Sequence, residues 1–431
     1  MKVCVQGLWH LGTVTAGCLA SVGHEVIGLD LDDDVILRLR VGEPPIFEPG
    51  LDEMIRAGLE SGRLRFIAGL ENLPSDIEIL WVAYDTPVDD DDVADVDFVF
   101  TQVEAALPHL PDNSTVLVSA QMPVGSVRRL EAFADKRCPA KGLSFACSPE
   151  DLRLGKALDA FLNPDRVVVG VRSERDKERI ERLLRPIADR IEWMSVEAAE
   201  MTKHAINAFL ATSVVFANEI AALCEMVGAD AKEVERGLKS EKRIGPDAYL
   251  SPGGAFAGGT LARDIEFLKG VSAKHQISVP LLESVKTSND EHKGWVRRKM
   301  QALFPNLRGV TVAVWGLTYK PGTDTLRRSL AVELCNWLIE QGVEVRVHDP
   351  EVKELPQEWG GIVHRYDDAL GMLAEAQVLL IGAEWPEYKT NRLEGVAAAN
   401  PDLIVIDPNR FLPIPGATEQ LRYFAVGTPC C

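Results

Sequence analysis

The feature that most constrains the fold is a pattern that occurs twice, at residues 2–32 and again at residues 309–350. Each copy has an apolar strand that ends in glycine, a turn, an amphipathic helix closed by glycine, and a second strand that ends in acid. "VQGLWHLG" matches "VWGLTYKPG", and "GHEVIGLD" matches "GVEVRVHD". A strand, helix, strand unit implies a parallel, doubly wound sheet. The repeat therefore predicts two Rossmann-like α/β domains.

The segment between the two copies is helical in pattern. Residues 195–229 form a long stretch of apolar periodicity without proline, which predicts one long helix or two joined end to end. Helical patterns continue to about residue 303. We therefore expect a Rossmann-like domain at 1–195, a central helical domain at 196–303, and a second, C-terminal Rossmann-like domain at 304–431.

The net charge and the cysteine pattern limit which partners and which cellular compartment we expect. The net charge of −19 argues against a nucleic-acid or anionic membrane surface, so we expect neither partner. The eight cysteines and eight histidines are scattered without metal-binding spacing, so we expect no metal and reduced thiols in the cytoplasm. The N-terminus lacks signal-peptide features, and no uninterrupted apolar run approaches the length of a membrane span.

The first turn resembles a phosphate-binding turn with one glycine replaced. Gly7, Trp9 and Gly12 occupy the positions of a G-x-G-x-x-G pattern, of which the outer two match. Asp30 ends the second strand at the position of an acid that binds the ribose 2′-hydroxyl of NAD. Asp32 is interpreted as a solvated turn residue. On this signal alone, a turn that binds no ligand remains an equal alternative.

Longer stretches together resemble the UDP-glucose/GDP-mannose 6-dehydrogenase family over nearly the whole chain, among them "SPEDLRLGKAL", "AAEMTKHAINAF", "KRIG", "RDIEFLKG" and "GLTYKPGTDTLRRS". The resemblance implies NAD as cofactor, bound by the domain at 1–195, and a nucleotide-sugar substrate, bound by the C-terminal domain at 304–431. It also implies a homodimer formed through the central helices, which makes 196–303 the dimerisation domain. In that family, two NAD oxidise the C6 alcohol of the sugar to a carboxylate.

The resemblance also implies roles for single residues. Lys203 matches the family's active-site lysine, and Asn207 lies one helical turn further on the same face. Glu150 matches a general acid/base, and Asp264 an aspartate that positions the hydrolytic water. Thr86 and Pro87 match a loop beside the nicotinamide. Arg243 matches an arginine that reaches the substrate, in the family sometimes across the dimer.

Three groups of site residues follow. The expected catalytic residues are Lys203, Asn207, Asp264, Glu150 and Thr260. The expected cofactor-binding residues are Gly7, Trp9, His10, Leu11, Gly12, Asp30, Thr86, Gln121 and Arg327. The expected substrate-binding residues are Glu150, Lys203, Asn207, Arg243, Tyr249, Gly258 and Lys320, with Asp324 beside them in the same turn as Lys320. The glycine-rich "GGAFAGG" is expected to offer backbone N–H groups to the sugar.

The chain departs from the family at the position of its nucleophile. The family loop reads Gly-Phe-Gly-Gly-Ser-Cys-Phe-Pro-Lys-Asp, whereas this chain has "AFAGGTLARD", with Thr260 in place of the cysteine and Arg263 in place of the lysine. Gln121 stands where the family has a threonine that helps place the hydrolytic water. A threonine hydroxyl ionises far above neutral pH, so it replaces a thiolate poorly. Cys147 is a weaker candidate for an alternative thiol.

Three hypotheses remain at this stage. The chain is a nucleotide-sugar dehydrogenase, limited to two electrons or completing the oxidation by a route without a covalent intermediate. It is instead a redox epimerase on the same scaffold, with transient NADH and no need for a thiol. The third alternative is a nucleotide-sugar-binding protein without catalysis, which the retained Lys203, Asn207, Asp264 and Glu150 disfavour.

Overall fold

Two largely parallel sheets form the framework of the chain, and the strand order of the smaller sheet repeats that of the first six strands of the larger one. The structure is a computed structural model and describes all residues except 88, 90–93, 151, 258, 413–420 and 430–431, together with the side chains of 391–393. By internal contact the chain divides into two units: unit 1 comprises residues 1–206 and 266–275, and unit 2 comprises residues 207–265 and 276–431. The three-domain division at 195 and 303 stays a prediction.

Unit 1 contains an eight-stranded sheet in the order β3-β2-β1-β4-β5-β6-β7-β8. The strands are β1 (Lys2–Gln6), β2 (Glu25–Asp30), β3 (Leu64–Ala68), β4 (Ile79–Val82), β5 (Thr115–Val118), β6 (Ser144–Cys147), β7 (Val167–Gly170) and β8 (Ile191–Met194). The first six strands have the Rossmann order. The helices are α1 (His10–Ser21), α2 (Asp33–Arg40), α3 (Leu51–Glu60), α4 (Val96–Ala106), α5 (Ser126–Arg137), α6 (Ala157–Leu162) and α7 (Glu174–Leu184).

One strand pair departs from the parallel sheet that the sequence predicts. β7 runs antiparallel to β6, with Cys147 opposite Gly170, and β8 is then parallel to β7. The expected parallel sheet is therefore confirmed for β1–β6 and corrected at this one step. The carboxyl ends of β1, β4, β5 and β6, which are parallel to one another, open toward the same edge. Ligands of doubly wound sheets bind at that edge.

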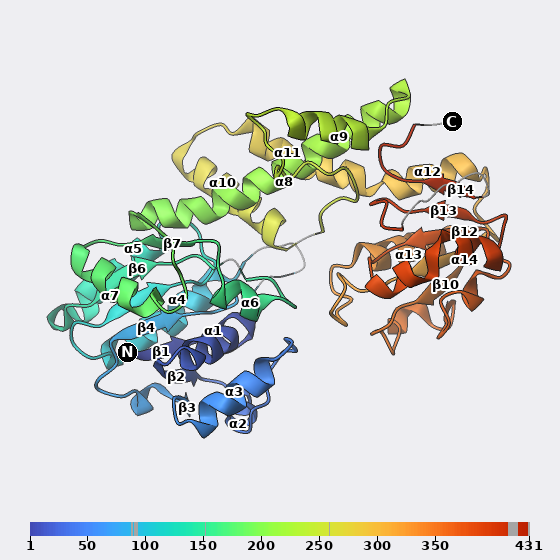
Figure 1. The fold of residues 1–431 in the computed structure, drawn as a ribbon. Coiled ribbons are helices and arrows are strands. Elements are labelled where there is room, and N and C mark those ends of the chain that lie inside the picture. Colours follow the sequence, from blue (N-terminus) through green and yellow to red (C-terminus); the bar gives the residue numbers. More distant parts are fainter. Residues whose placement is uncertain (88, 90–93, 151, 258, 413–420, 430–431) are drawn as a thin grey trace. The chain divides into compact units, whose positions relative to one another are not determined.

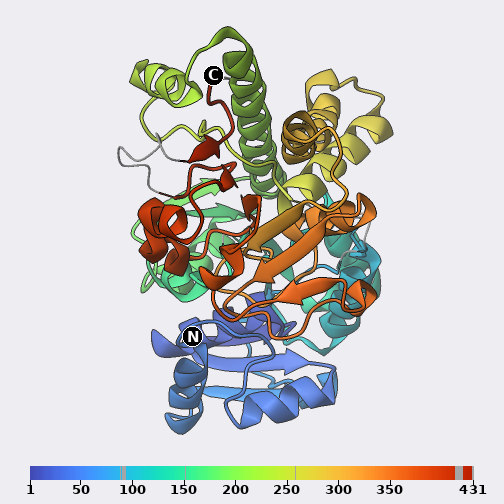
Figure 2. The same cartoon turned by 90° about the vertical axis from the view of Figure 1, so that its right-hand side faces the viewer.

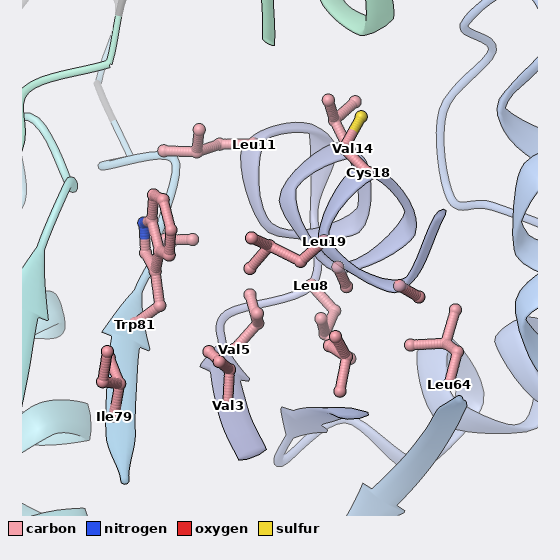
Figure 3. Packing of buried hydrophobic residues seen from close by; sticks show 14 of the residues in the cluster. Val3, Val5, Leu8, Leu11, Val14, Cys18, Leu19, Leu64, Ile79 and Trp81 are labelled. Atoms are coloured by element: carbon pink, nitrogen blue, oxygen red, sulfur yellow. The ribbon is translucent and has the colours of Figure 1, made fainter. Parts of the chain in front are cut away.

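Side-chain alternation along β1 supplies both faces of the sheet. Val3 and Val5 belong to one hydrophobic cluster and Cys4 to another, as expected for a strand covered on both sides. Figure 3 shows α1 above β1, with Leu19 of the helix facing Val5 of the strand and Leu11 on the side of Trp81. This packing fixes the first turn of α1 at the end of β1.

Unit 2 contains a six-stranded parallel sheet in the order β11-β10-β9-β12-β13-β14. Its strands are β9 (Thr311–Trp315), β10 (Glu344–His348), β11 (Val363–Arg365), β12 (Val378–Ile381), β13 (Ile404–Ile406) and β14 (Arg422–Phe424). Its helices are α9 (Ala231–Ser240), α11 (Pro280–Lys293), α12 (Trp295–Leu303), α13 (Leu330–Glu340) and α14 (Arg392–Ala399). Figure 1 draws this sheet in orange and red. The second Rossmann-like domain is confirmed.

Helix α8 (Val196–Val227) is a single helix of 32 residues, drawn in green along its length in Figure 2. Its first turns belong to unit 1 and its remaining length to unit 2, and α10 (Thr260–His275) likewise contributes to both units. α8 is long and apolar enough to span a membrane by length and composition alone. The expectation that no such segment exists is therefore corrected, although core helices of soluble proteins meet the same criterion.

Candidate functional site

The turn between β1 and α1 is shaped by its two glycines. Gly7 has a φ of +90°, a conformation that residues with a side chain rarely adopt. A Cβ on Gly12 would lie 1.6 Å from the carbonyl oxygen of Gly7, so only glycine lets the helix start this close to the strand. These two residues leave the backbone open to a pyrophosphate at the start of α1, which fits a dinucleotide.

Asp30 and Trp9 flank this turn. The Asp30 carboxylate accepts hydrogen bonds from the backbone N–H groups of Leu8, at 2.7 Å, and Asp32, at 3.1 Å. The Trp9 side chain, in place of the middle glycine, is 50% exposed. Asp32 is more than a solvated turn residue, because its carboxylate caps α2 by accepting from the N–H groups of Asp34 and Val35.

Asp85 is a residue of this turn that the sequence reasoning missed. The backbone N–H of Leu11, in the first turn of α1, donates to the Asp85 carboxylate at 2.9 Å. Asp85 is exposed and follows β4 in "YDTP", at the end of the strand beside β1. A carboxylate thus lies at the helix N-terminus, where an anion is stabilised. An acid three residues after the end of a central strand was the available signal.

Two further predicted cofactor residues lie together at neighbouring strand ends. The Thr86 hydroxyl donates to the backbone carbonyl of Gln121 at 2.6 Å, and both side chains are buried. Gln121, where the family has a threonine, therefore sits beside the predicted nicotinamide loop. His10, the first residue of α1, is hydrogen-bonded to Glu48 through Nε2 at 2.9 Å.

Glu150 and Lys203 are brought together within unit 1. The Lys203 ammonium donates to the backbone carbonyl of Glu150 at 2.5 Å, and its Nζ lies 3.9 Å from the Glu150 carboxylate. The same carboxylate accepts from the backbone N–H of Leu152 at 2.7 Å. The Lys203 side chain is largely enclosed, so it is a held group rather than a solvated one. A lysine beside a carboxylate is suited to moving a proton.

The thiol of Cys147 is poorly suited to nucleophilic attack. It is the last residue of β6 and is buried. Burial first, and then the charge of Glu200, raise the pKa of this thiol well above its ordinary value. A thiol becomes a nucleophile only when it loses its proton. The structure therefore argues against Cys147 as an alternative thiol.

Asn207 and Asp264 are brought together within unit 2. The side-chain amide of Asn207 donates to the Asp264 carboxylate, and Asp264 has no exposed surface. Asn207 lies on α8 one turn after Lys203, as its spacing predicts. Thr260 is the exposed first residue of α10, one turn before Asp264 on the same helix. Its hydroxyl is thus placed where the family pattern has a thiol.

The glycine-rich segment before Thr260 is held by polar side chains. The N–H groups of Gly253, Gly254 and Phe256 donate to Asn218, Asn409 and Asn289, at 3.0, 2.6 and 2.9 Å. The expectation that this part of the loop offers its backbone N–H groups to the sugar is therefore wrong for these three groups. They are already paired, and what they provide is a fixed backbone shape. Gly258 lies outside the described residues.

The same segment borders a cavity of about 500 Å³ in unit 2. Its basic side chains are Lys293, Arg297 and Lys320, and its acidic ones are Glu333 and Glu384. Burial raises the pKa of the Glu384 carboxyl above its ordinary value, with a hydrogen bond to Asn409 acting in the opposite direction. A concave site with a few convergent charged groups suits a small charged ligand. Of the predicted substrate residues, Lys320 lines this cavity.

Arg243, Tyr249 and Arg327 do not line this cavity. Arg243 is exposed and forms an ion pair with Glu241 at 2.9 Å, and Tyr249 is 60% exposed. Arg327 and Asp324 are exposed in the loop before α13. Within the described part of the chain, no group of three or more histidine, cysteine or acidic side chains is arranged to bind a metal ion.

The second Rossmann-like turn is closed where the first is open. Asp349, the counterpart of Asp30, is buried and accepts from the N–H groups of Leu317, at 2.7 Å, and Thr318, at 3.1 Å. The indole N–H of Trp385 donates to the same carboxylate at 3.1 Å. Asp349 is thus buried and already paired with backbone and indole donors, so the dinucleotide features belong to the first turn.

The comparisons with known proteins agree with this division. The NAD-binding domain of the UDP-glucose/GDP-mannose dehydrogenase family matches residues 1–188, its central domain residues 197–291, and its UDP-binding domain residues 313–413. The chain is 31% identical to a UDP-glucose 6-dehydrogenase of Pseudomonas aeruginosa, over 100% of this chain and 98% of that protein. It is 32% identical to a UDP-glucose 6-dehydrogenase of Rhizobium meliloti, over the full length of both.

Solved structures extend the likeness to the fold. A UDP-glucose dehydrogenase of Pyrobaculum islandicum superposes with a TM-score of 0.87, is 28% identical, and is covered over 98% of its chain by 100% of this one. The match to the NAD-binding domain covers the open first turn, and the match to the UDP-binding domain covers Lys320 and Glu384 of the charged cavity in unit 2. The chain therefore belongs to the UDP-glucose/GDP-mannose dehydrogenase family and is an NAD-dependent nucleotide-sugar dehydrogenase.

Proposed function

We propose that this enzyme oxidises one alcohol carbon of a UDP-sugar by two electrons and does not complete the family's second, thiol-dependent oxidation. The observation that carries the proposal is Thr260 at the exposed start of α10, one turn before the buried Asp264. Capture of an aldehyde needs a nucleophile that is ionised near neutral pH. A threonine hydroxyl is not, whereas the first hydride transfer needs no covalent bond to the protein.

The cysteines that the structure describes support this limit. Of the six, five are buried and Cys138 is half-buried. Burial raises the pKa of the Cys18 and Cys335 thiols to about 12, and it raises the pKa of Cys138 as well. Thiols in this state are small apolar side chains rather than nucleophiles. Within the described residues, no other thiol is therefore suited to replace the missing one.

The chain's own residues divide the work of the oxidation. When NAD is bound, its nicotinamide accepts the hydride that leaves the alcohol carbon. Lys203 and Glu150 hold the sugar hydroxyl and take up its proton, a role for which their mutual contact suits them. Asn207 and Asp264, paired within unit 2, are assigned to the catalytic set as well, and Thr86 with Gln121 to the nicotinamide. Gly7, Trp9, His10, Leu11, Gly12, Asp30 and Arg327 serve the rest of the cofactor.

The cavity of unit 2 is proposed to hold the nucleotide. Its volume of about 500 Å³ and its three basic side chains suit a nucleoside diphosphate. The UDP-binding domain of the family matches residues 313–413, which include Lys320 and Glu384 of the lining, and two full-length relatives are named UDP-glucose 6-dehydrogenases. UDP-glucose is therefore the first substrate to test. Arg243 and Tyr249 are proposed to serve the sugar from outside the cavity.

We further infer a homodimer formed through α8. Phe209, Phe216 and Leu223 follow one another at intervals of seven residues on this helix, and all three are exposed. Side chains seven residues apart lie on one helix face, so they form a continuous apolar stripe. Met226 and Val227 extend it with exposed side chains. Such a stripe on a family enzyme is best accounted for by a second copy of the chain.

A reducing, cytoplasmic setting is proposed as well. The six described cysteines are all free thiols. Unpaired buried cysteines are typical of proteins kept in a reducing compartment.

The function is tested by incubating the purified enzyme with NAD and a panel of UDP-, GDP- and other nucleotide sugars. NADH formation is followed at 340 nm, and the sugar product is identified by mass spectrometry. We expect NADH with a UDP-sugar and a product lighter by two hydrogens. Lys320→Ala should raise KM for the sugar more than it lowers kcat, because Lys320 lines the cavity. A changed sugar without net NADH would contradict the proposal and indicate epimerisation.

A further inference from the structure

Glu200 is a buried acid on α8 that has no part in the oxidation proposed above. Only 6% of its surface is exposed, and its two carboxylate oxygens accept the backbone N–H groups of Gly125, at 2.7 Å, and Val127, at 2.9 Å. Burial raises the pKa of this carboxyl above its ordinary value, and the two N–H groups act in the opposite direction. A buried acid is stable only where donors surround it, so these contacts bind Glu200 to the backbone of residues 125–127.

The two donors belong to the start of α5. This helix begins at Ser126, and Gly125 at its N-cap has a φ of +93°, a conformation that favours glycine. Glycine has no side chain that could cap a helix, so the first N–H groups need an acceptor from another part of the chain. Glu200 supplies this acceptor, and its negative charge suits the N-terminal end of the helix dipole. The start of α5 is therefore fixed to α8.

The segment that leads from β5 to α5 is held to α8 at a second point. Nε2 of His204, one turn after Glu200, donates to the backbone carbonyl of Met122 at 3.0 Å, and His204 is buried. Met122 directly follows Gln121, whose own carbonyl accepts the Thr86 hydroxyl at 2.6 Å. The backbone at Gln121 is therefore fixed from two sides, by α8 and by the loop after β4.

The same face of α8 carries Lys203. Glu200, Lys203 and His204 follow one another at spacings of three and one residues, which places them on one side of the helix. Together with Gln121 and Glu150, they are among the residues that line a small cavity of about 20 Å³. The residue assigned to the nicotinamide and the lysine assigned to the hydroxyl proton thus meet at one place, and α8 holds both.

We propose that Glu200 is a positioning residue, which keeps Gln121 in its place beside the nicotinamide and next to Lys203. It acts through the start of α5 rather than by contact with cofactor or sugar. Without Glu200, the start of α5 loses its acceptor, Gln121 shifts, and the nicotinamide is bound less tightly. The adenosine and pyrophosphate, which the turn between β1 and α1 serves, are bound as before. The proposal rests on the role proposed above for Gln121, and it does not depend on how far the sugar is oxidised.

The test compares two ligands that differ in the nicotinamide. NADH carries this ring, whereas ADP-ribose has the same adenosine, pyrophosphate and second ribose without it. The dissociation constants of both are measured by calorimetric titration of the full chain. No sugar is added, so failure of the proposed sugar oxidation would leave the test intact.

Glu200→Gln is the decisive variant, because its amide keeps the shape of the side chain but has one acceptor oxygen in place of two. We expect the dissociation constant of NADH to rise about five-fold, which corresponds to the loss of one hydrogen bond. The dissociation constant of ADP-ribose should stay unchanged. If Glu200→Gln does not fold, Glu200→Asp takes its place. It keeps the charge, and its shorter side chain reaches the start of α5 less well, so NADH alone should again be bound more weakly.

Glu197→Gln is the matched control. Glu197 lies one turn before Glu200 on α8, but its carboxylate pairs with the side chains of Arg128 and Arg172 instead of the backbone at the start of α5. Both dissociation constants should therefore equal those of the unmodified enzyme.

Two results with the Glu200 variants would overturn the proposal. An equal rise of both dissociation constants would show that Glu200 supports the whole of unit 1 and not the nicotinamide side in particular. An unchanged dissociation constant of NADH would show that Gln121 keeps its place without Glu200.

Discussion

The side-chain amide of Asn207 donates a hydrogen bond to the carboxylate of Asp264, and Asp264 is completely enclosed. A buried carboxylate depends on its donors, so removal of one is costly. We expect Asn207→Ala to lower the free energy of unfolding by about 1–3 kcal/mol and to lower kcat more than it raises KM. Urea unfolding and steady-state kinetics measure the two effects. Thr212→Ala is the control, because this hydroxyl donates only within its own helix turn, to the carbonyl of Ala208. Equal losses of unfolding free energy and of kcat in Asn207→Ala and Thr212→Ala would refute a special role for the pair of Asn207 and Asp264.

Asp85 places a negative charge where the cofactor's pyrophosphate is expected. The carboxylate accepts the N–H of Leu11 at 2.9 Å, and a pyrophosphate at the helix start would compete for this donor. Asp85→Asn should therefore lower KM for NAD by about 2–5-fold, as expected for an exposed charge near a helix N-terminus. The gain should shrink in high salt. Asp52→Asn, in the first turn of α3, is the matched control. An unchanged or higher KM for NAD in Asp85→Asn would show that the Asp85 carboxylate does not weaken NAD binding.

His292 makes the stability of unit 2 depend on pH. Its Nε2 donates to the carbonyl of Gly253 at 2.8 Å, and burial lowers the pKa of its ring below the ordinary value of 6.5. The unfolded chain therefore binds a proton more readily than the folded one. As far as His292 is concerned, the free energy of unfolding has its full value above pH 6.5. It decreases as the pH falls below 6.5, by at most about 1.4 kcal/mol per pH unit.

Urea unfolding at pH 7.5 and 5.5 measures this loss. His292→Gln keeps a donor for Gly253 and cannot be protonated, so the difference between the two pH values should be smaller than in the unmodified enzyme. His275→Gln, at the end of α10, serves as control. An equal pH dependence in His292→Gln and the unmodified enzyme would assign the effect to other groups.

The exposed stripe on α8 should set the oligomeric state. Phe209 is 70% exposed, and Phe216 lies two turns further on the same face. A charge in the centre of an apolar interface is desolvated without a partner, so Phe216→Glu should convert a dimer to a monomer. Sedimentation velocity measures the change. Arg236→Glu, at an exposed position on α9, is the control for an added acid. A monomeric unmodified enzyme, or a dimeric Phe216→Glu, would refute the proposed interface.

The sequence predicted the parts of the fold that depend on local pattern. The two copies of strand, glycine and helix predicted the parallel sheets around β1 and β9, because strand and helix periodicities are set by neighbouring residues. The spacing of Lys203 and Asn207 placed both on one face of α8 for the same reason. The antiparallel step between β6 and β7 was not predictable in this way, since it depends on which distant strands meet.

The site was predicted as a set of residues rather than as an arrangement. The sequence of "GGAFAGG" predicts a loop open to the sugar, because its partners Asn289 and Asn409 are distant in sequence. The contact of Asp85 with Leu11 was missed since it joins two loops at separate strand ends. Glu200 carries no catalytic pattern, and only its burial and its two backbone donors single it out. Such pairings are decided by tertiary structure.

The most direct measurement of the central claim is the number of NADH formed per molecule of UDP-sugar consumed, with the product analysed for aldehyde, ketone or carboxylate. With Thr260 in place, we predict one NADH per sugar and no carboxylate. If the product is an aldehyde, Thr260→Cys should form carboxylate as well and raise the number of NADH per sugar toward two. The reason is that a thiol can capture the aldehyde for the second oxidation. Two NADH per sugar and a carboxylate product from the unmodified enzyme would contradict the account.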